Sequence, residues 1–290
     1  MTTGAPADPS PETIAELLTQ WVDPVTDEPT GTKYCLYPTP RRGENTQGSY
    51  LTALPPGYEE HSSKRYPVIY WLHGRLGNAR QGAWAVQHYG AAMRASNMPE
   101  AIIILVQALP VGWYVDSKDG KLPIEQVIIH DLIPHIDATY RTISHPGGRG
   151  LEGYSMGGFG SLHFGLKFPN LFGAISAVAP SILRNPSEEQ LSRTSYTFDG
   201  DQNYYEEVGP WRLAERNAEA LKQAKTRMRI VSGGQDRHLR ATLEEYHFWL
   251  TNCKVEHRFT LLPDVGNGYQ EIIENIGSAA FDFWTNAFSW

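Results

Sequence analysis

The feature that most constrains this chain is the stretch 153–158, which reads GYSMGG and fits the pattern G-x-S-x-G. In that pattern a serine sits on a sharp turn between a strand and a helix. Residues 148–152 can form the strand, and apolar residues at helical spacing follow until Pro169, before which the helix must end. A serine in a strained turn leaves no room for side chains two positions either side, which explains the two flanking glycines. The stretch predicts that Ser155 is a nucleophile; the alternative is a plain glycine-rich turn.

Short apolar runs recur along the chain with helical patterns between them. Strands that alternate with helices imply right-handed crossovers, so we expect an α/β fold with a mostly parallel sheet and helices on both faces. The first two strands are close in sequence and should be antiparallel at an edge. The predicted strands are residues 33–37, 47–54, 66–72, 101–107, 148–152, 172–179, 228–232 and 256–262. The predicted helices begin at residues 11, 83, 124, 156 and 270, and Pro134 should kink or break the third.

No boundary or repeat divides the chain, so residues 1–290 are predicted to form one domain, with residues 1–11 mobile. Residues 181–226 are long, polar and rich in aromatic side chains. We expect this segment to be an insertion over the edge of the sheet where the strands end, because ligands bind there in such folds. The alternative is a solvated excursion whose aromatic side chains pack inward.

The composition is that of an ordinary globular protein, with a net charge of −7 and no basic block. These features argue against nucleic acid and anionic membranes as partners. No apolar run approaches the roughly 20 residues of a membrane-spanning helix, and the N-terminus lacks the features of a signal peptide. Localisation and oligomeric state stay open. Cys35 and Cys253 can be two free thiols or one disulfide.

Five stretches resemble a known family: LPPGY at 54–58, YWLHG at 70–74, DLIPHID at 131–137, GYSMGG at 153–158 and SGGQD at 232–236. With them the chain resembles an α/β-hydrolase, more narrowly the esterase D / feruloyl esterase-type family, which also includes the bacterial mycolyltransferases. Order and spacing fit from about residue 45 to the C-terminus. The resemblance implies serine hydrolysis of carboxylic esters through an acyl-enzyme, with no metal and no organic cofactor.

Acyl transfer also needs donors for the oxyanion and a carboxylate that orients the base. One donor should be the backbone N–H of Met156, and the second that of Arg75 in the loop after the third strand. His73 in this loop is expected to be structural. Asp236 follows a strand through two glycines and is the predicted acid; the alternatives are a turn aspartate or Asp264.

The base is where the chain departs from the family. The family carries a histidine after a glycine in the loop that follows the last strand, and the matching position here is Asn267. An amide has no lone pair basic enough to take a hydroxyl proton. Three explanations stay open: a histidine-to-asparagine variant, a natural member that lost or relocated its base, or a wrong register. His238 could reach the pocket, whereas His163 is expected to be packed and His257 lies at the wrong end of the sheet.

Trp113 and Tyr114 are predicted to rim the pocket, where aromatic rings suit a planar acyl group or a sugar ring. The alternative is that both are packed loop residues. The leading hypothesis is a feruloyl- or acetyl-type serine esterase acting on a small or carbohydrate-linked ester, impaired by Asn267. An acyltransferase on the same scaffold and a non-catalytic ligand-binding protein are the alternatives.

Overall fold

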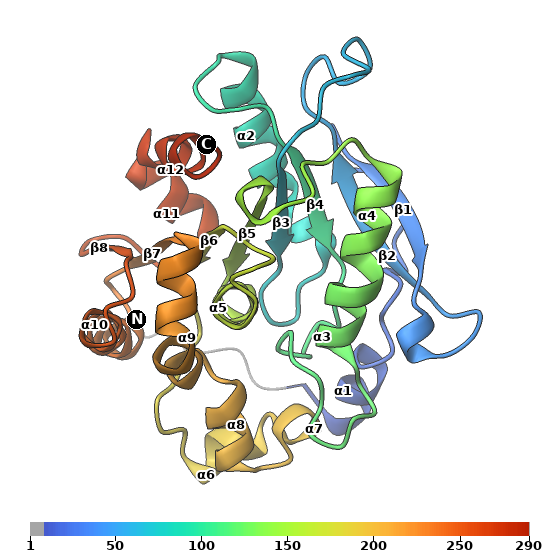
Figure 1. The fold of residues 1–290 in the computed structure, drawn as a ribbon. Coiled ribbons are helices and arrows are strands. Elements are labelled where there is room, and N and C mark those ends of the chain that lie inside the picture. The colour runs from blue at the N-terminus through green and yellow to red at the C-terminus, as the bar shows by residue number, and fades with distance from the viewer. Residues whose placement is uncertain (1–8, 290) are drawn as a thin grey trace.

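The computed structural model describes residues 9–289, and an eight-stranded sheet lies at its centre (Figure 1). The strand order is β1-β2-β4-β3-β5-β6-β7-β8. β2 runs antiparallel to β1 and β4, and the strands from β4 to β8 are parallel. The α/β class and the antiparallel edge are therefore confirmed. The strands are β1 (Lys33–Pro38), β2 (Gln47–Ala53), β3 (Val68–Leu72), β4 (Ile102–Val106), β5 (Arg149–Tyr154), β6 (Ala174–Val178), β7 (Arg227–Gly233) and β8 (Arg258–Leu262).

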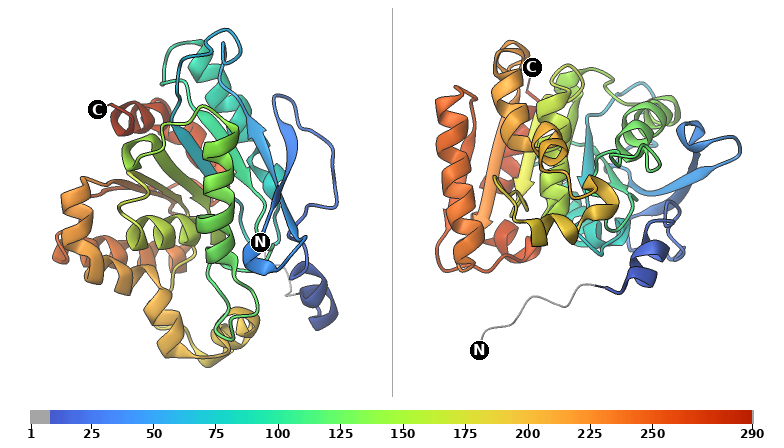
Figure 2. Two further views of the ribbon diagram at one scale, coloured as in Figure 1. Left: turned by 45° about the vertical axis from the view of Figure 1, so that its right-hand side comes forward. Right: turned by 90° about the horizontal axis from the view of Figure 1, so that it is seen from below.

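Helices cover both faces of the sheet, so its central strands are apolar on both sides (Figure 2). In β3, Ile69 and Trp71 belong to one apolar cluster, and the alternate residues belong to the other. The first layer contains α2 (Ala83–Arg94), α11 (Tyr269–Ile276) and α12 (Ala279–Ala287). The opposite layer contains α3 (Ile124–Val127), α4 (Ile133–Thr139), α5 (Met156–Lys167), α9 (Pro210–Ala224) and α10 (Arg237–Asn252).

Two predicted helices are divided. A π-helical turn at Ile128–Leu132 separates α3 from α4, just before Pro134, which has no N–H to donate to the preceding turn. Gly277, at φ +54°, lies between α11 and α12. At the N-terminus α1 (Pro11–Leu17) starts at the predicted residue, and Ser10 caps it; residues 1–8, which were predicted to be mobile, lie outside the described residues. Short 3-10 helices occupy Pro40–Arg42, Ala79–Gly82 and Pro146–Gly148.

Residues 181–208 form an excursion of three short helices, α6 (Glu188–Ser192), α7 (Ser195–Phe198) and α8 (Gln202–Val208), grouped beyond one end of the sheet (Figure 1). They bind the loop that follows β4: Lys118 N–H donates to the Thr197 carbonyl at 2.9 Å, and the Tyr204 hydroxyl donates to the Asp116 carbonyl at 2.8 Å. Phe198, Tyr205 and Trp211 are buried. Residues 210–224 leave the excursion and form α9, which packs on α5 as the crossover helix to β7.

Three further facts bear on function. None of the helices within residues 9–289 combines the length and the apolar character that a membrane crossing requires. In the same part of the chain, no three or more His, Cys, Asp or Glu side chains gather as metal ligands would. Cys35 and Cys253 are free thiols.

Candidate active site

Ser155 occupies the turn between β5 and α5 in a strained backbone conformation. Its φ is 54° and its ψ is −111°, a combination that costs a non-glycine residue roughly 1–3 kcal/mol. Three backbone hydrogen bonds hold it: Ser155 N–H donates to the Val178 carbonyl, and the Ser155 carbonyl accepts from Phe159 and Ser181, each at 3.0 Å. Hydrogen bonds to β6, to α5 and to the segment after β6 therefore hold the strained conformation of Ser155.

The two glycines flanking Ser155 are required by close backbone contacts. A Cβ at Gly153 would lie 1.8 Å from the Gly157 carbonyl oxygen, and a Cβ at Gly157 would lie 2.0 Å from the Leu72 carbonyl oxygen. Real Cβ atoms do not approach oxygen so closely. The explanation given from the sequence, that no side chain fits two positions either side of the serine, holds at both positions.

The loop after β3 passes directly beside the nucleophile. A Cβ at Gly74 would lie 3.5 Å from Ser155 Cβ, and Gly74 N–H donates to Gln81 Oε1 at 2.6 Å. Arg75 is the next residue. Met156 is the first residue of α5, so its N–H has no acceptor within the helix and lies at the positive end of the helix dipole. The amides of Met156 and Arg75 stay the predicted oxyanion donors.

His73 in this loop is structural. Its ring is completely buried, with Nδ1 2.9 Å from the Gly74 carbonyl and Nε2 3.1 Å from the Ala108 carbonyl. Burial lowers the pKa of His73, so the ring is neutral at pH 7. It ties the loop after β3 to the end of β4.

Ser155, Asp236 and Asn267 line one cavity of about 300 Å³ at the carboxyl ends of the strands. Asp264, the alternative acid, is not part of this lining. Asp236 is the N-cap of α10, and its Oδ1 accepts the backbone N–H groups of His238 and Leu239 at 3.0 Å each. The remaining lining residues are Tyr154, Ala179, Ser181, Ile182, Leu183, His238, Leu239 and Thr242.

Asn267 differs from Asp236 in the hydrogen bonds of its side-chain oxygen. Its Oδ1 is buried and has no hydrogen-bond partner among the described residues. Such a group lacks compensation for its desolvation, whereas the carboxylate of Asp236 has two donors. His238, the one histidine in the lining, is exposed at the start of α10. The cavity thus brings together a serine, a carboxylate, an amide and a histidine.

Comparison with known proteins identifies the family of this chain. The family model described as "Putative esterase" matches residues 45–288. The chain belongs to that esterase family. Esterase Rv1288 of Mycobacterium tuberculosis is 34% identical over 135 residues, which cover 45% of this chain and 29% of that protein. An endo-1,4-beta-xylanase/feruloyl esterase of Xylanibacter ruminicola is 30% identical over 181 residues, which cover 59% of this chain and 24% of that protein. The matched parts span less than a third of these curated relatives.

Solved structures share the α/β-hydrolase fold with this chain. A ferulic acid esterase superposes with a TM-score of 0.71 at 20% identity, covering 89% of this chain and 99% of that one. A fluorophosphonate-binding serine hydrolase of Staphylococcus aureus, solved with substrate bound, gives 0.70 at 15% identity, covering 88% and 98%. A ferulic acid esterase of Anaeromyces mucronatus, in complex with ferulic acid, gives 0.62 at 19% identity, covering 92% and 93%.

A network around a buried ion pair connects the two sides of the cavity that Ser155 lines. Glu152 lies three residues before Ser155, and its Oε1 accepts the hydroxyls of Tyr89 at 2.8 Å and Tyr269 at 2.5 Å. Its Oε2 accepts Ser176 Oγ at 2.7 Å and Arg229 Nη2 at 2.9 Å. Tyr269 follows Asn267 by two residues. The nucleophile strand and the loop that carries Asn267 are therefore anchored on one carboxylate.

A second buried network holds the nucleophile helix. His163 on α5 lies 2.6 Å from Glu125 Oε2 through its Nε2, and Lys167 Nζ donates to both oxygens of Glu125, at 2.8 and 2.6 Å. Burial raises the pKa of Glu125, but the hydrogen bonds and charges of His163 and Lys167 outweigh it and lower the pKa to about 2. His163 is thus a packed histidine, as its place on α5 indicated.

The predicted aromatic rim needs correction. Tyr114 is completely buried and its hydroxyl donates to the His73 carbonyl at 3.0 Å, so it supports the loop after β3 and meets no ligand. Trp113 packs edge to face on Phe159 at 5.5 Å and is absent from the lining of the cavity. Both residues have positive φ, 57° and 61°, which turns this loop inward. The cavity wall comes instead from residues 181–183, the start of the segment that was expected over this edge of the sheet, and from α10, where His238 was expected to reach the pocket.

Proposed function

We propose that this protein is a serine carboxylic-ester hydrolase that acts through an acyl-enzyme and whose turnover is impaired by Asn267. The convergence of Ser155, Asp236 and Asn267 on one cavity is the observation that supports the proposal. In it, Ser155 Oγ attacks the ester carbonyl, and the N–H groups of Met156 and Arg75 stabilise the oxyanion. Each such donor lowers the barrier by roughly 3–4 kcal/mol.

The impaired step is proton transfer. The Ser155 proton must leave as the bond to carbon forms, and the amide at position 267 cannot take it at neutral pH. Loss of the histidine from a serine triad costs up to roughly 10⁶ in kcat, while the oxyanion donors and binding retain about 10³–10⁴ over water. We therefore expect a folded protein that binds its ester and turns it over slowly.

The proposed substrates are esters of hydroxycinnamic or acetic acid with sugars, phenols or small alcohols. The names of the relatives support this class, because one is a xylanase/feruloyl esterase and one solved structure holds ferulic acid. If an alcohol replaced water as acyl acceptor, the same site would be a transferase, and product analysis with a competing alcohol separates the two.

A second candidate function is a non-catalytic ligand-binding protein that retains the fold. Asn267 favours it, because an amide at the position of the base leaves the cavity in place without a group that can take the serine proton. A third arrangement relocates the base to His238, which lines the same cavity.

Hydrolysis of p-nitrophenyl acetate and methyl ferulate by four proteins separates these possibilities: the unaltered chain, Asn267→His, His238→Gln and Ser155→Ala. The proposal expects little turnover by the unaltered chain, a gain of at least about 100-fold in kcat from Asn267→His, and no effect of His238→Gln. Full activity that disappears in His238→Gln would establish the relocated base. No gain from a correctly folded Asn267→His would favour the binding protein.

A further inference from the structure

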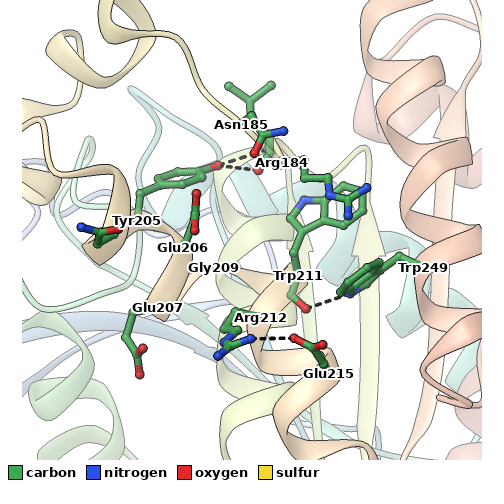
Figure 3. A pocket seen from close by; sticks show the side chains of 12 residues that line it. Arg184, Asn185, Tyr205, Glu206, Glu207, Gly209, Trp211, Arg212, Glu215 and Trp249 are labelled. Carbon is green, nitrogen blue, oxygen red and sulfur yellow. Dashed lines mark hydrogen bonds and ion pairs between the residues drawn. The ribbon is translucent and has the colours of Figure 1, made fainter.

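A second cavity, of about 440 Å³, lies between the excursion, α9 and α10 (Figure 3). Tyr205 and Trp211 stand on opposite sides of it, with Arg212 and Glu215 below them. Its volume falls within the range of roughly 300–1,000 Å³ that is usual for small-molecule sites. Nothing in the catalytic arrangement described above uses this cavity. Its lining includes five charged residues, Arg184, Glu206, Glu207, Arg212 and Glu215, and also Asn203.

The second cavity adjoins the one that holds Ser155. Leu183 lines both, and the Tyr205 hydroxyl fixes it by accepting its N–H at 3.1 Å and donating to its carbonyl at 3.2 Å. Helix α10 also runs past both cavities, since Thr242 lines the first and Trp249 the second. These residues lie two turns apart on one side of the helix, or roughly 10 Å along its axis. A molecule a few rings long can reach from one cavity to the other.

Two indoles and a guanidinium form the aromatic part of the second cavity. The rings of Trp211 and Trp249 are 6.2 Å apart, and Trp249 Nε1 donates to the Trp211 carbonyl at 2.9 Å. Arg184 lies over both, with its Cζ 5.3 Å from the Trp211 ring and 4.7 Å from the Trp249 ring. Trp211 is 7% exposed, and its Nε1 has no partner among the described residues. The cavity therefore has rigid apolar surfaces, of which the Trp249 ring is more exposed than the Trp211 ring.

Four of the five charged residues in the lining have a partner of opposite charge. Arg184 Nη1 donates to Glu245 at 2.5 Å, Arg212 Nη1 to Glu215 at 2.8 Å, and Glu207 accepts Arg216 Nη1 at 2.6 Å. Glu206, the fifth, accepts Gln202 Nε2 at 2.6 Å and has no cationic partner among the described residues. The lining therefore carries one excess negative charge, which disfavours an anion. Amides, carboxylates and guanidinium groups together supply both acceptors and donors, which suits hydroxyl groups because each hydroxyl both donates and accepts.

We propose that the second cavity binds a neutral sugar unit, and that this unit belongs to the alcohol part of the ester that reacts at Ser155. Aromatic faces contact the C–H surfaces of a sugar ring, and the surrounding polar side chains bind its hydroxyls. The link to Ser155 depends on the proposed hydrolase function. Sugar binding itself does not, because it needs no turnover.

The first test measures binding of xylotetraose by isothermal titration calorimetry to the Ser155→Ala protein, which cannot react. We expect binding, weakened about tenfold or more when Trp249→Ala removes an aromatic anchor and also when Asn203→Trp fills the cavity. Phe248→Ala is the matched control, because Phe248 is the neighbouring aromatic residue, is 66% exposed and lines neither cavity. It should leave the affinity unchanged. The anionic trimer of galacturonic acid should bind more weakly than xylotetraose.

The second test uses the Asn267→His protein and compares KM for methyl ferulate with KM for a feruloylated xylo-oligosaccharide. Trp249→Ala should raise KM about tenfold for the second substrate and leave KM for the first unchanged. Absence of xylotetraose binding, or equal binding by correctly folded Trp249→Ala and Asn203→Trp proteins, would overturn the proposal. If neither ester is hydrolysed but xylotetraose binds as expected, the hydrolase function fails and the sugar site stands.

Discussion

Two sides of the cavity differ in how firmly they are held. The nucleophile side carries Ser155, and the base side carries Asp236 and Asn267. Around Ser155, the strained turn is held by three backbone bonds and enclosed by glycines whose Cβ positions are filled by carbonyl oxygens. Across the cavity, Asp236 is an exposed helix cap, and the buried Oδ1 of Asn267 has no partner within residues 9–289. The parts proposed to position and polarise an ester are held by several contacts each, whereas the part proposed to move a proton is not.

In the proposed function, this difference assigns binding and proton transfer to separable parts of one scaffold. The Glu152 network ties both sides to the same buried carboxylate, so the loop around residue 267 is held in place even though its side chain contributes no base. Substitutions on the nucleophile side should therefore affect folding, and those on the base side should affect mainly catalysis.

The largest effect on stability should come from Gly157→Ala. The new Cβ would lie 2.0 Å from the Leu72 carbonyl oxygen, and backbone cannot move aside without breaking the link between β3 and α5. We expect a loss of more than about 4 kcal/mol in the free energy of unfolding, measured in urea. Gly90→Ala in α2 is the control, because its Cβ would meet only the end of the Arg94 side chain at 3.5 Å, and it should add about 0.5–1 kcal/mol. Equal behaviour of the two variants would contradict the account of the turn.

Glu152→Gln should come next, because it leaves the buried Arg229 guanidinium without its counter-charge. A broken buried pair costs about 3–5 kcal/mol, which urea unfolding can measure. Glu100→Gln makes the same chemical change in the exposed pair with Lys64, 2.5 Å apart, and should cost less than about 1 kcal/mol. A small loss for Glu152→Gln would mean that the network does not tie the two sides together.

The third effect is a dependence of stability on pH that originates in Glu125 of α3, where it contacts α5. The pKa of Glu125 is lowered from 4.5 to about 2, so the folded state holds this carboxylate ionised more strongly than the unfolded state does. Its contribution, about 3 kcal/mol, is complete above pH 4.5 and is lost as pH falls towards 2. Urea unfolding at a series of pH values should show a decline in this window that is shallower in Glu125→Gln. An identical slope in both proteins would refute the assignment.

The smallest effect on stability should be that of Asp236→Ala on the base side. The change removes the cap that accepts two backbone N–H groups of α10, and such losses cost about 1 kcal/mol. Asp236→Asn is the matched variant, since asparagine caps helices equally well and should leave the unfolding free energy almost unchanged. A loss from Asp236→Asn as large as that from Glu152→Gln would show that the base side is as firmly built as the nucleophile side.

The same contrast explains what could be predicted from the sequence. The turn around Ser155 depends on neighbouring residues, and the central strands are continuous apolar runs, so local pattern was sufficient for both. Helices α9 and α10 were not predicted, although Leu243, Tyr246 and Leu250 recur at helical spacing and Asp236 precedes them as a cap. Most of the residues in these helices are polar, so the helical spacing of the few apolar residues was overlooked.

Other features could not be predicted, because tertiary contacts decide them. The inward turn of Trp113 and Tyr114 needs positive φ at two consecutive aromatic residues, which only the packing around His73 and Phe159 makes favourable. Likewise, the place of Leu183 between two cavities is set by the Tyr205 hydroxyl, 22 residues away in sequence.

The most direct test of the central claim is the rate at which a fluorophosphonate labels Ser155, followed by mass spectrometry of the intact protein. Labelling requires the serine proton to leave but needs neither a particular alcohol nor product release. The account predicts slow labelling of the unaltered chain, none of Ser155→Ala, and a rate at least about 100-fold higher in Asn267→His, rising with pH around the ordinary histidine pKa of about 6.5. Rapid labelling of the unaltered chain, with no further gain from Asn267→His, would contradict it.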